Sequence, residues 1–232
     1  MARKPKSGAS RRPTVRAAAP ATGRDKIVAA FMALLAETSF ERIELAEVAK
    51  QAGVSLADLR GEFSSTLAIL AAHIKAIDRA VLSGGDAEMA DETPRERLFD
   101  VLMRRLELLA PHKNAARSLL RSARRNPGVA LALNTLAVRS QQWMLTAAGI
   151  GAAGPRGVVR AQGLALMFAN VLRVWVDDED DGQAKTLAAL DRELERGQRL
   201  AGLLDDLCGL PKRICSLARR PRRRGRDARA AA

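Results

Sequence analysis

The feature that most limits the possible folds is a helical spacing of apolar residues, which repeats from about residue 24 to about residue 207. Apolar side chains recur every three or four residues, as at Ile27, Phe31 and Leu34, and this spacing places them on one face of a helix. No segment shows the alternation with a period of two that a half-buried strand requires. The sequence therefore predicts an all-α fold.

Glycine, proline and capping residues divide this pattern into about nine helices. The clearest helix start is Thr93-Pro94-Arg95-Glu96, a capping box with a proline at the first helical position. Gly53 and the pair Gly84-Gly85 are expected to end the second and the fourth helix. The helix that begins after Thr93 is expected to reach about residue 110, and the remaining helices are expected at 113–125, 127–148, 156–177 and 184–207.

The positive charge of the chain is concentrated at its two ends. The formal net charge is +13, but residues 1–23 carry +6 and residues 211–232 carry +8, which leaves −1 for residues 24–210. Both ends lack apolar periodicity, so we expect two disordered basic arms. Such arms either improve solubility or contact nucleic acid or an anionic membrane without sequence preference.

The part between the arms is long enough for two domains, which we expect at 24–83 and 84–210. Cys208 and Cys215 are too few for a disulfide framework, which favours the reducing environment of the cytoplasm. The N-terminus lacks the apolar core of a secretory signal, although an Arg-rich, acid-free start is also typical of mitochondrial transit peptides. The longest apolar run, Gly163–Val176, is interrupted by polar residues, so no membrane span is expected.

Residues Glu44–Phe63 have the residue types and the spacing of a helix-turn-helix. Ala49 is small enough for the second helix to pack against it, and Gly53 can adopt the left-handed conformation that the turn needs. Leu59 is placed to anchor the second helix in the core, and Ser55 opens a capping box at its start. The pattern predicts a helix-turn-helix within a three-helix unit.

The segment GRDKIVAAFMALLAETSFERIELAEVAKQAGVSLADLRGEFSSTLAIL, and its continuation to about Val81, resembles the N-terminal domain of the TetR (tetracycline-repressor) family. The resemblance implies a DNA-binding head, a linking fourth helix and a helical domain whose last two helices form a homodimer. It implies operator binding in successive major grooves, with release when a small apolar ligand binds, and it implies no cofactor. The DNA-binding residues carried over are Lys50, Ser55, Leu56, Ala57, Arg60 and Thr66.

Several of these positions depart from the family pattern. Ile43 and Glu44 stand where the family usually has Thr or Ser, and Thr66 where it usually has Lys. Arg60 stands where it commonly has Tyr, and Glu62 where it commonly has His or Tyr. From Glu41 to Thr66 there are three bases and five acids. Because DNA affinity depends largely on neutralising phosphates, these departures favour an alternative, a member of the fold that does not bind DNA.

A second resemblance supports this alternative. The stretch HKNAARSLL…QQWMLTAAGI…VLRVWVDDEDDGQAKTLAALDRELERG is similar to the C-terminal region of TetR-fold proteins of ubiquinone biosynthesis. It implies binding of isoprenoid or other lipid, with the fold used for a purpose other than repression.

The charges of the second domain are segregated along the chain. Leu108–Val176 contains nine bases and no acid, whereas 177–206 contains ten acids and four bases. Within the first stretch, the bases of 113–125 recur at helical spacing. We expect the two segments to attract each other within the fold or across a dimer, or else the basic helix to lie on an anionic membrane surface.

The bulky apolar residues of the second domain either form its core or line a ligand pocket. The candidate ligand-binding residues are Met103, Trp143, Met144, Met167, Phe168, Asn170 and Trp175, with Asn170 and Arg173 as polar groups that could orient the ligand. The candidates for a dimer face are Val159, Ala165, Phe168, Leu172, Leu187, Leu190, Leu194, Leu203 and Leu207. Sequence alone does not separate interface from core.

No residue pattern indicates an enzyme or a metal site. There is no phosphate-binding loop, nucleophile elbow or dinucleotide-binding glycine pattern. His73 and His112 fall on different expected helices without a nearby cysteine or paired carboxylate, so we expect ordinary surface or capping roles for them. Asp177–Asp181 lacks the ligand spacing of a calcium loop and is interpreted as a solvated turn.

Overall fold

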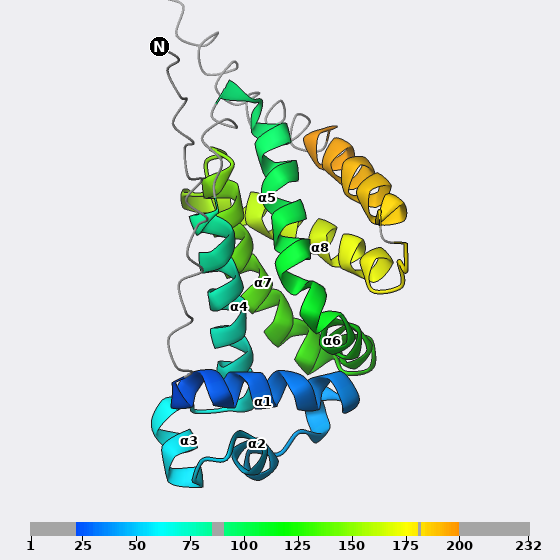
Figure 1. The fold of residues 1–232 in the computed structure, drawn as a ribbon. Helices are drawn as coiled ribbons and strands as arrows, with labels where there is room; N and C mark the ends of the chain where they lie inside the picture. Colours follow the sequence, from blue (N-terminus) through cyan, green and yellow to red (C-terminus); the bar gives the residue numbers. More distant parts are fainter. Residues whose placement is uncertain (1–21, 85–90, 181, 200–232) are drawn as a thin grey trace, which may run out of the picture.

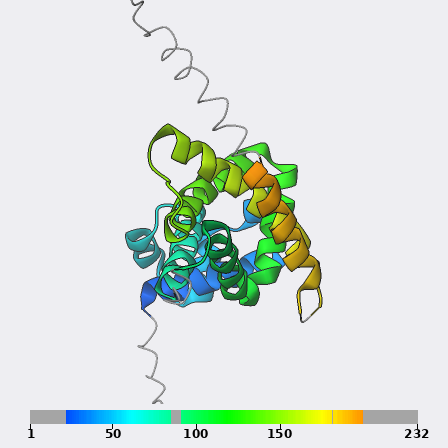
Figure 2. The ribbon, with the colours of Figure 1, turned by 90° about the horizontal axis from the view of Figure 1, so that it is seen from above.

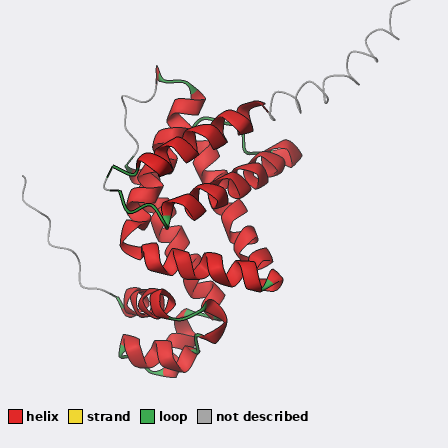
Figure 3. Ribbon diagram, turned by 90° about the vertical axis from the view of Figure 1, so that its right-hand side faces the viewer, coloured by secondary structure: helices red, strands yellow, loops and turns green. Residues whose placement is uncertain are grey.

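The computed structural model describes residues 22–84, 91–180 and 182–199, and every regular element within these ranges is helical (Figure 3). The α-helices with defined bounds are α1 (Gly23–Glu37), α2 (Leu45–Ala52), α3 (Leu56–Glu62), α4 (Thr66–Ser83), α5 (Pro94–Leu109), α6 (Lys113–Arg125), α7 (Pro127–Ala147) and α8 (Gly154–Trp175). Two short 3₁₀ helices are η1 (Phe40–Arg42) and η3 (Ala110–His112), and another helix covers 184–199. The predicted all-α fold is confirmed.

Parts of some predictions lie outside the described residues. These are residues 1–21 of the expected N-terminal arm, the arm at 211–232, both cysteines, Gly85 and the last part of the expected helix 184–207. The arm was expected to end at residue 23. This boundary was wrong, because Thr22 caps α1 and Gly23 is the first residue of that helix.

Three of the helices in the described ranges begin with a capping box. Those at Ser55 and Thr93 were predicted, and the one at Thr22 was missed although its sequence has the same spacing. In each box the hydroxyl accepts a hydrogen bond from the backbone N–H three residues later, and the carboxylate at that later residue accepts one from the capping residue. The pKa of each of these carboxyl groups is lowered, first because the capping hydroxyl donates a hydrogen bond to the ionised form.

The helices form two units with separate apolar cores, which we call the head (α1–α4) and the body (α5–α8 with 184–199). In Figure 1 the head lies at the bottom, with α2 and α3 beneath α1, and α4 rises from it into the body. Ile69 and Leu70 of α4 are buried in the head core, whereas Ile77 and Val81 of the same helix are buried in the body core. Since each such side chain contributes ~1.5–3 kcal/mol when buried, α4 is held firmly by both units.

A second connection between head and body is made by α6, which packs against α1 (Figure 1). Ala115 of α6 is buried in the head core. The Ser118 hydroxyl donates a hydrogen bond to the backbone oxygen of Thr38 at 2.8 Å, just after the end of α1. The helix at 184–199 lies on one side of the body, as Figure 1 and Figure 2 show.

The acidic segment that follows α8 is more than a solvated turn. The Asp178 carboxylate is buried and accepts hydrogen bonds from the Thr186 N–H at 2.9 Å and the Thr186 hydroxyl at 2.7 Å. The Thr186 hydroxyl is also the main reason that the pKa of Asp178 is lowered. The interpretation of the whole segment as solvated was therefore wrong at Asp178, which fixes the connection between α8 and the helix at 184–199.

The expected attraction between basic and acidic segments occurs within the fold. Lys113, the first residue of α6, donates a hydrogen bond to the backbone oxygen of Asp178. Arg117, one turn later, donates to the backbone oxygen of Val176, and its Nε lies 3.4 Å from Asp177 Oδ1. The later bases of α6 are exposed.

Candidate functional sites

The turn between α2 and α3 has the geometry of a helix-turn-helix. Gly53 has φ +66° and ψ 36°, the left-handed conformation that the sequence predicts. The Val54 N–H donates to the Ala49 oxygen at 3.1 Å, which closes the end of α2. Ala49 and Leu59 are 3% and 2% exposed, so both helices of the motif are anchored in the head core.

The six residues expected to contact DNA lie on α2, on α3 and its cap, and on the first residue of α4. All are exposed except for the half-buried last one: Lys50, Ser55, Leu56, Ala57, Arg60 and Thr66. Leu56 is 57% exposed, although it is a large apolar side chain. The hydroxyl of Ser55 donates a hydrogen bond to Asp58 at 2.7 Å, within the cap of α3.

One acid of the recognition helix is paired with a base from outside the motif. Arg24, in the first turn of α1, lies with its Nη1 3.0 Å from Glu62 Oε2 and 3.2 Å from the Glu62 backbone oxygen. Its guanidinium also lies over the Phe63 ring, 4.3 Å from the ring centre. Arg24 lies outside the range 41–66, so the count of three bases and five acids over that range does not include it.

Two further acids of that count are also engaged within the fold. The Asp58 carboxylate accepts hydrogen bonds from Ser55 in the cap of α3, and the Glu41 carboxylate accepts one at 3.0 Å from the Ser122 hydroxyl of α6. Glu44 and Glu47 are exposed and make no ion pair with any described residue. The hydroxyl groups that engage Asp58 and Glu41 leave these carboxylates charged, whereas Arg24 offsets the charge of Glu62.

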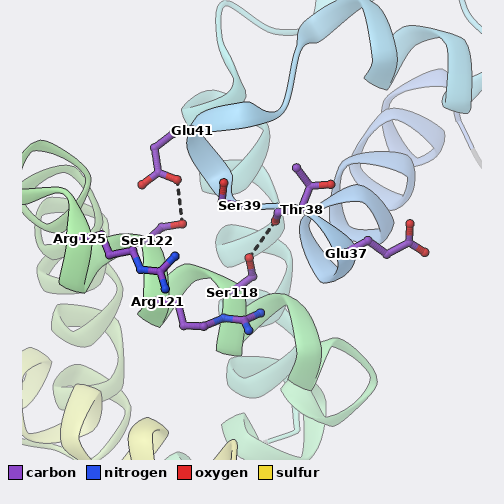
Figure 4. A pocket seen from close by; sticks show the side chains of 8 residues that line it. All are labelled: Glu37, Thr38, Ser39, Glu41, Ser118, Arg121, Ser122 and Arg125. Carbon is purple, nitrogen blue, oxygen red and sulfur yellow. Dashed lines mark hydrogen bonds between the residues drawn. The ribbon is translucent and has the colours of Figure 1, made fainter.

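A polar groove of about 270 Å³ separates the end of the head from α6 (Figure 4). Its head wall carries two acids and its α6 wall two bases one helical turn apart, with small hydroxyl residues between them. The lining residues are Glu37, Thr38, Ser39, Glu41, Ser118, Arg121, Ser122 and Arg125. The hydrogen bonds of Ser118 and Ser122 cross this boundary.

The interior of the body contains a buried ion pair that the sequence analysis missed. Arg105 of α5 donates a hydrogen bond to Asp78 Oδ1 of α4, and the same oxygen accepts from the Ser140 hydroxyl of α7 at 2.7 Å. The three residues are 5%, 7% and 3% exposed. A signal was present, because Arg105 and Asp78 occupy core positions of apolar helical stripes, where a charge needs a partner.

The two histidines meet beside this ion pair, contrary to the expectation of separate surface or capping roles. The His73 and His112 rings pack edge to face with their centres 4.6 Å apart. Burial lowers the pKa of His73 to about 4, with further contributions from His112 and Arg105, and burial also lowers the pKa of His112. His73 is therefore uncharged at neutral pH.

Comparison with solved structures identifies this arrangement of head and body. A TetR transcriptional regulator from Nitrosomonas europaea superposes with a TM-score of 0.58 at 25% identity, over 75% of this chain and 97% of that one. The chain has the fold of the TetR-family regulators. TetR regulators from Rhodococcus (TM-score 0.51, 23% identity, 74% and 94% covered) and Streptomyces coelicolor (0.53, 14%, 87% and 90%) share this fold. No sequence-family profile matches the chain, and a sequence comparison with curated proteins gives no match.

In this TetR-fold chain the seven candidate ligand-binding residues are not gathered around one pocket. Met144, Met167, Phe168 and Trp175 are buried in the body core, and Met103 packs against it partly buried: these five share one cluster. Trp143 is 58% exposed, and Asn170 is exposed and accepts a hydrogen bond from Arg173 at 2.8 Å. The grouping of these two with the others was wrong, because neighbouring helical positions differ by about 100° in direction.

None of the helices in the described ranges is both long and apolar enough to cross a membrane.

Proposed function

We propose that this protein is a TetR-family transcriptional regulator that binds operator DNA through its head and a small, largely apolar ligand through its body. The observation that carries the proposal is the exposed face of α3. Ser55 caps this helix and Leu59 anchors it, so that Leu56, Ala57 and Arg60 face outward on a rigid support. A short exposed helix of this kind fits the major groove of DNA.

The chemistry of the exposed residues assigns different roles to them. Arg60 has the donor geometry to bind a guanine edge or a phosphate, and Leu56 is suited to contact a thymine methyl group. Lys50 on α2 is placed as a point charge for a phosphate. The ion pair of Arg24 with Glu62 supports DNA binding, because it offsets an acid that would repel the phosphates. A cytoplasmic location goes with this proposal, since operator DNA is found there.

Ligand binding would reach the head through two elements. α4 belongs to both cores, so a shift of its body half moves its first residue, Thr66, beside the recognition helix. α6 acts on α1 through the groove of Figure 4, where Ser118 bonds Thr38 and Ser122 bonds both Glu41 and the Phe40 N–H. A ligand that favours one packing of the body would thereby favour one position of the head.

A homodimer is part of the proposal, because an operator with two half-sites is bound by two heads, one from each subunit. Apolar side chains are exposed along α8, with Val159 56% and Leu166 57% exposed and Gly163 between them at helical spacing. Of the predicted dimer-face residues, Ala165, Phe168, Leu190 and Leu194 are instead buried within one chain, and Leu203 and Leu207 lie outside the described residues. We propose α8 around Val159 and Leu166 as the dimer face.

The deciding experiment is selection of DNA sequences from a random pool by the full-length protein at physiological salt. We expect a palindromic consensus, which Arg60→Ala recovers more weakly and with a relaxed preference at one base pair. Arg139→Ala is the matched control, since it removes the same charge from an exposed position of α7 in the body. The basic ends of the chain contribute equally in all three proteins, so a specific effect of Arg60 cannot come from them.

Enrichment without any sequence preference would overturn the regulator proposal. It would favour the alternative from the sequence, a lipid-binding protein that uses this fold for a purpose other than repression.

A further inference from the structure

Four exposed charged side chains line the polar groove between the head and α6 (Figure 4). Arg121 and Arg125 lie one helical turn apart on the α6 side, and Glu37 and Glu41 lie on the head side. None of the four makes an ion pair with any residue that the structure describes. Two bases and two acids around one groove are therefore left without a counter-charge.

Two buried serines of α6 connect the walls of this groove. Ser118 and Ser122 are 3% and 2% exposed. The Ser118 hydroxyl donates to the Thr38 oxygen at 2.8 Å, and the Ser122 hydroxyl donates to the Glu41 carboxylate at 3.0 Å. The Ser122 hydroxyl also accepts a hydrogen bond from the Phe40 N–H at 3.2 Å. These bonds fix the two walls relative to each other, so that the charges border an open space of about 270 Å³.

The balance of charge around the groove selects the kind of ligand. A simple anion would be attracted by the two bases and repelled by the two acids, and a cation would meet the reverse. A molecule that carries both charges gains from both walls when its charged groups are turned toward them. Guanidinium groups donate in pairs to a carboxylate, and the carboxylates of the head wall can accept from an ammonium group.

We propose that this groove binds a small zwitterion of the amino-acid class. Its carboxylate lies between Arg121 and Arg125, and its ammonium group is turned toward Glu37 and Glu41. A space of about 270 Å³ has room for a short carbon chain between the two charged groups. The bound zwitterion contacts the head and α6 together, so it favours the position of the head in this structure.

The site is separate from the interior of the body, and it depends neither on an apolar ligand there nor on DNA binding.

The test compares zwitterions with their singly charged analogues on the full-length protein at pH 7, by ligand-detected NMR titration. The zwitterions are β-alanine, 4-aminobutanoate and 6-aminohexanoate, which differ in the separation of their charges. Each is compared with the carboxylate and the alkylammonium ion of the same chain length. We expect at least one zwitterion to bind roughly fivefold more tightly than both of its analogues, and to lose affinity as salt is added.

Two double variants test which wall holds which charge. Glu37→Gln/Glu41→Gln should reverse the preference, so that the carboxylate analogue binds more tightly than the zwitterion. Arg121→Gln/Arg125→Gln should instead favour the alkylammonium ion. Because glutamine at position 41 can still accept the hydrogen bond of Ser122, the connection between the walls is retained. A disturbed fold would weaken all three kinds of probe and would not reverse their order.

Matched controls remove equivalent charges outside the groove. Glu44→Gln/Glu47→Gln removes two exposed acids of the head, and Arg124→Gln removes an exposed base of α6, and none of these residues lines the groove. The order of the probes should stay unchanged in both controls.

The inference is overturned if no probe binds, or if each zwitterion binds no more tightly than its analogues. It is also overturned if the controls change the order of the probes as much as the groove variants do. The proposed function fails separately. Operator selection without zwitterion binding leaves the regulator and removes this site, whereas zwitterion binding without operator selection does the reverse.

Discussion

Arg24 Nη1 and Glu62 Oε2 lie 3.0 Å apart, which joins the first turn of α1 to the last residue of the recognition helix. Both side chains are about half exposed, so the pair is worth little as a stabilising contact. Its importance is electrostatic, because it places a base beside an acid at the end of α3. The same guanidinium covers Phe63, which holds it in place.

Removal of Arg24 should weaken DNA binding more than it weakens the fold. In Arg24→Ala the Glu62 carboxylate is left unpaired near the phosphates, and we expect a roughly fivefold loss of operator affinity, about 1 kcal/mol. Fluorescence anisotropy with the selected operator measures it. The double variant Arg24→Ala/Glu62→Gln should recover most of the loss, and an unrecovered loss would mean that Arg24 contacts DNA itself.

Arg60 and Lys50 should differ in what their loss does to DNA recognition. Arg60→Ala is expected to cost about 1–3 kcal/mol on the operator and to relax the preference at one base pair, as for a base-edge contact. Lys50→Ala should weaken binding to operator and to random DNA alike, as expected for a phosphate contact. It should also reduce the slope of log affinity against log salt concentration by about one. Binding to both DNAs over a salt series distinguishes the two, and identical profiles would contradict these roles.

Acid should destabilise the protein through His73. Its pKa is about 4 in the folded state against 6.5 for an unperturbed histidine, so the unfolded chain takes up this proton at a higher pH than the folded protein does. The free energy of unfolding should therefore fall as the pH drops from about 6.5 to 4, by up to about 3 kcal/mol. Urea denaturation at pH 7 and pH 4.5 measures this difference.

The variant His73→Leu isolates this contribution. It cannot titrate, so its stability should drop less than that of the original protein over the same interval, while the capping carboxylates contribute equally to both. An equal drop in the two proteins would show that other groups cause the acid sensitivity.

Two glycines of the helix-turn-helix should respond in opposite ways to alanine. Gly53→Ala should destabilise the head by about 1–2 kcal/mol, because φ +66° is strained for any residue with a Cβ atom. Gly61 lies within α3 and has open space at its Cβ position, so Gly61→Ala should stabilise the head by about 0.5–1 kcal/mol. Chemical denaturation of both variants checks the pair, and a neutral Gly53→Ala would contradict the role of the turn.

Much of the fold could be predicted because it is encoded locally. Capping boxes such as Ser55 with Asp58, and apolar residues three or four positions apart, act within one or two helical turns. The helix 113–125 was placed with its correct bounds for this reason. The capping box at Thr22 was missed although it has the same local form, so that miss was an oversight and not a limit of the sequence.

The sites were predicted less well. The exposed residues of α3 could be placed because the helix has one anchored side, set by Leu59. The body was different, because Trp143 and Met144 are adjacent in sequence and yet one lies on the surface and the other in the core. Which side of a long helix faces the core depends on neighbours that come from distant parts of the chain.

By itself the sequence determined the helices, their caps and the helix-turn-helix, since these depend on interactions over a few residues. Only the tertiary structure decided which charges meet. Arg24 reaches Glu62 across 38 positions and Asp78 meets Arg105 across 27, because helix packing brings them together. That packing brings a base to one acid of the head and pairs two opposite charges inside the body.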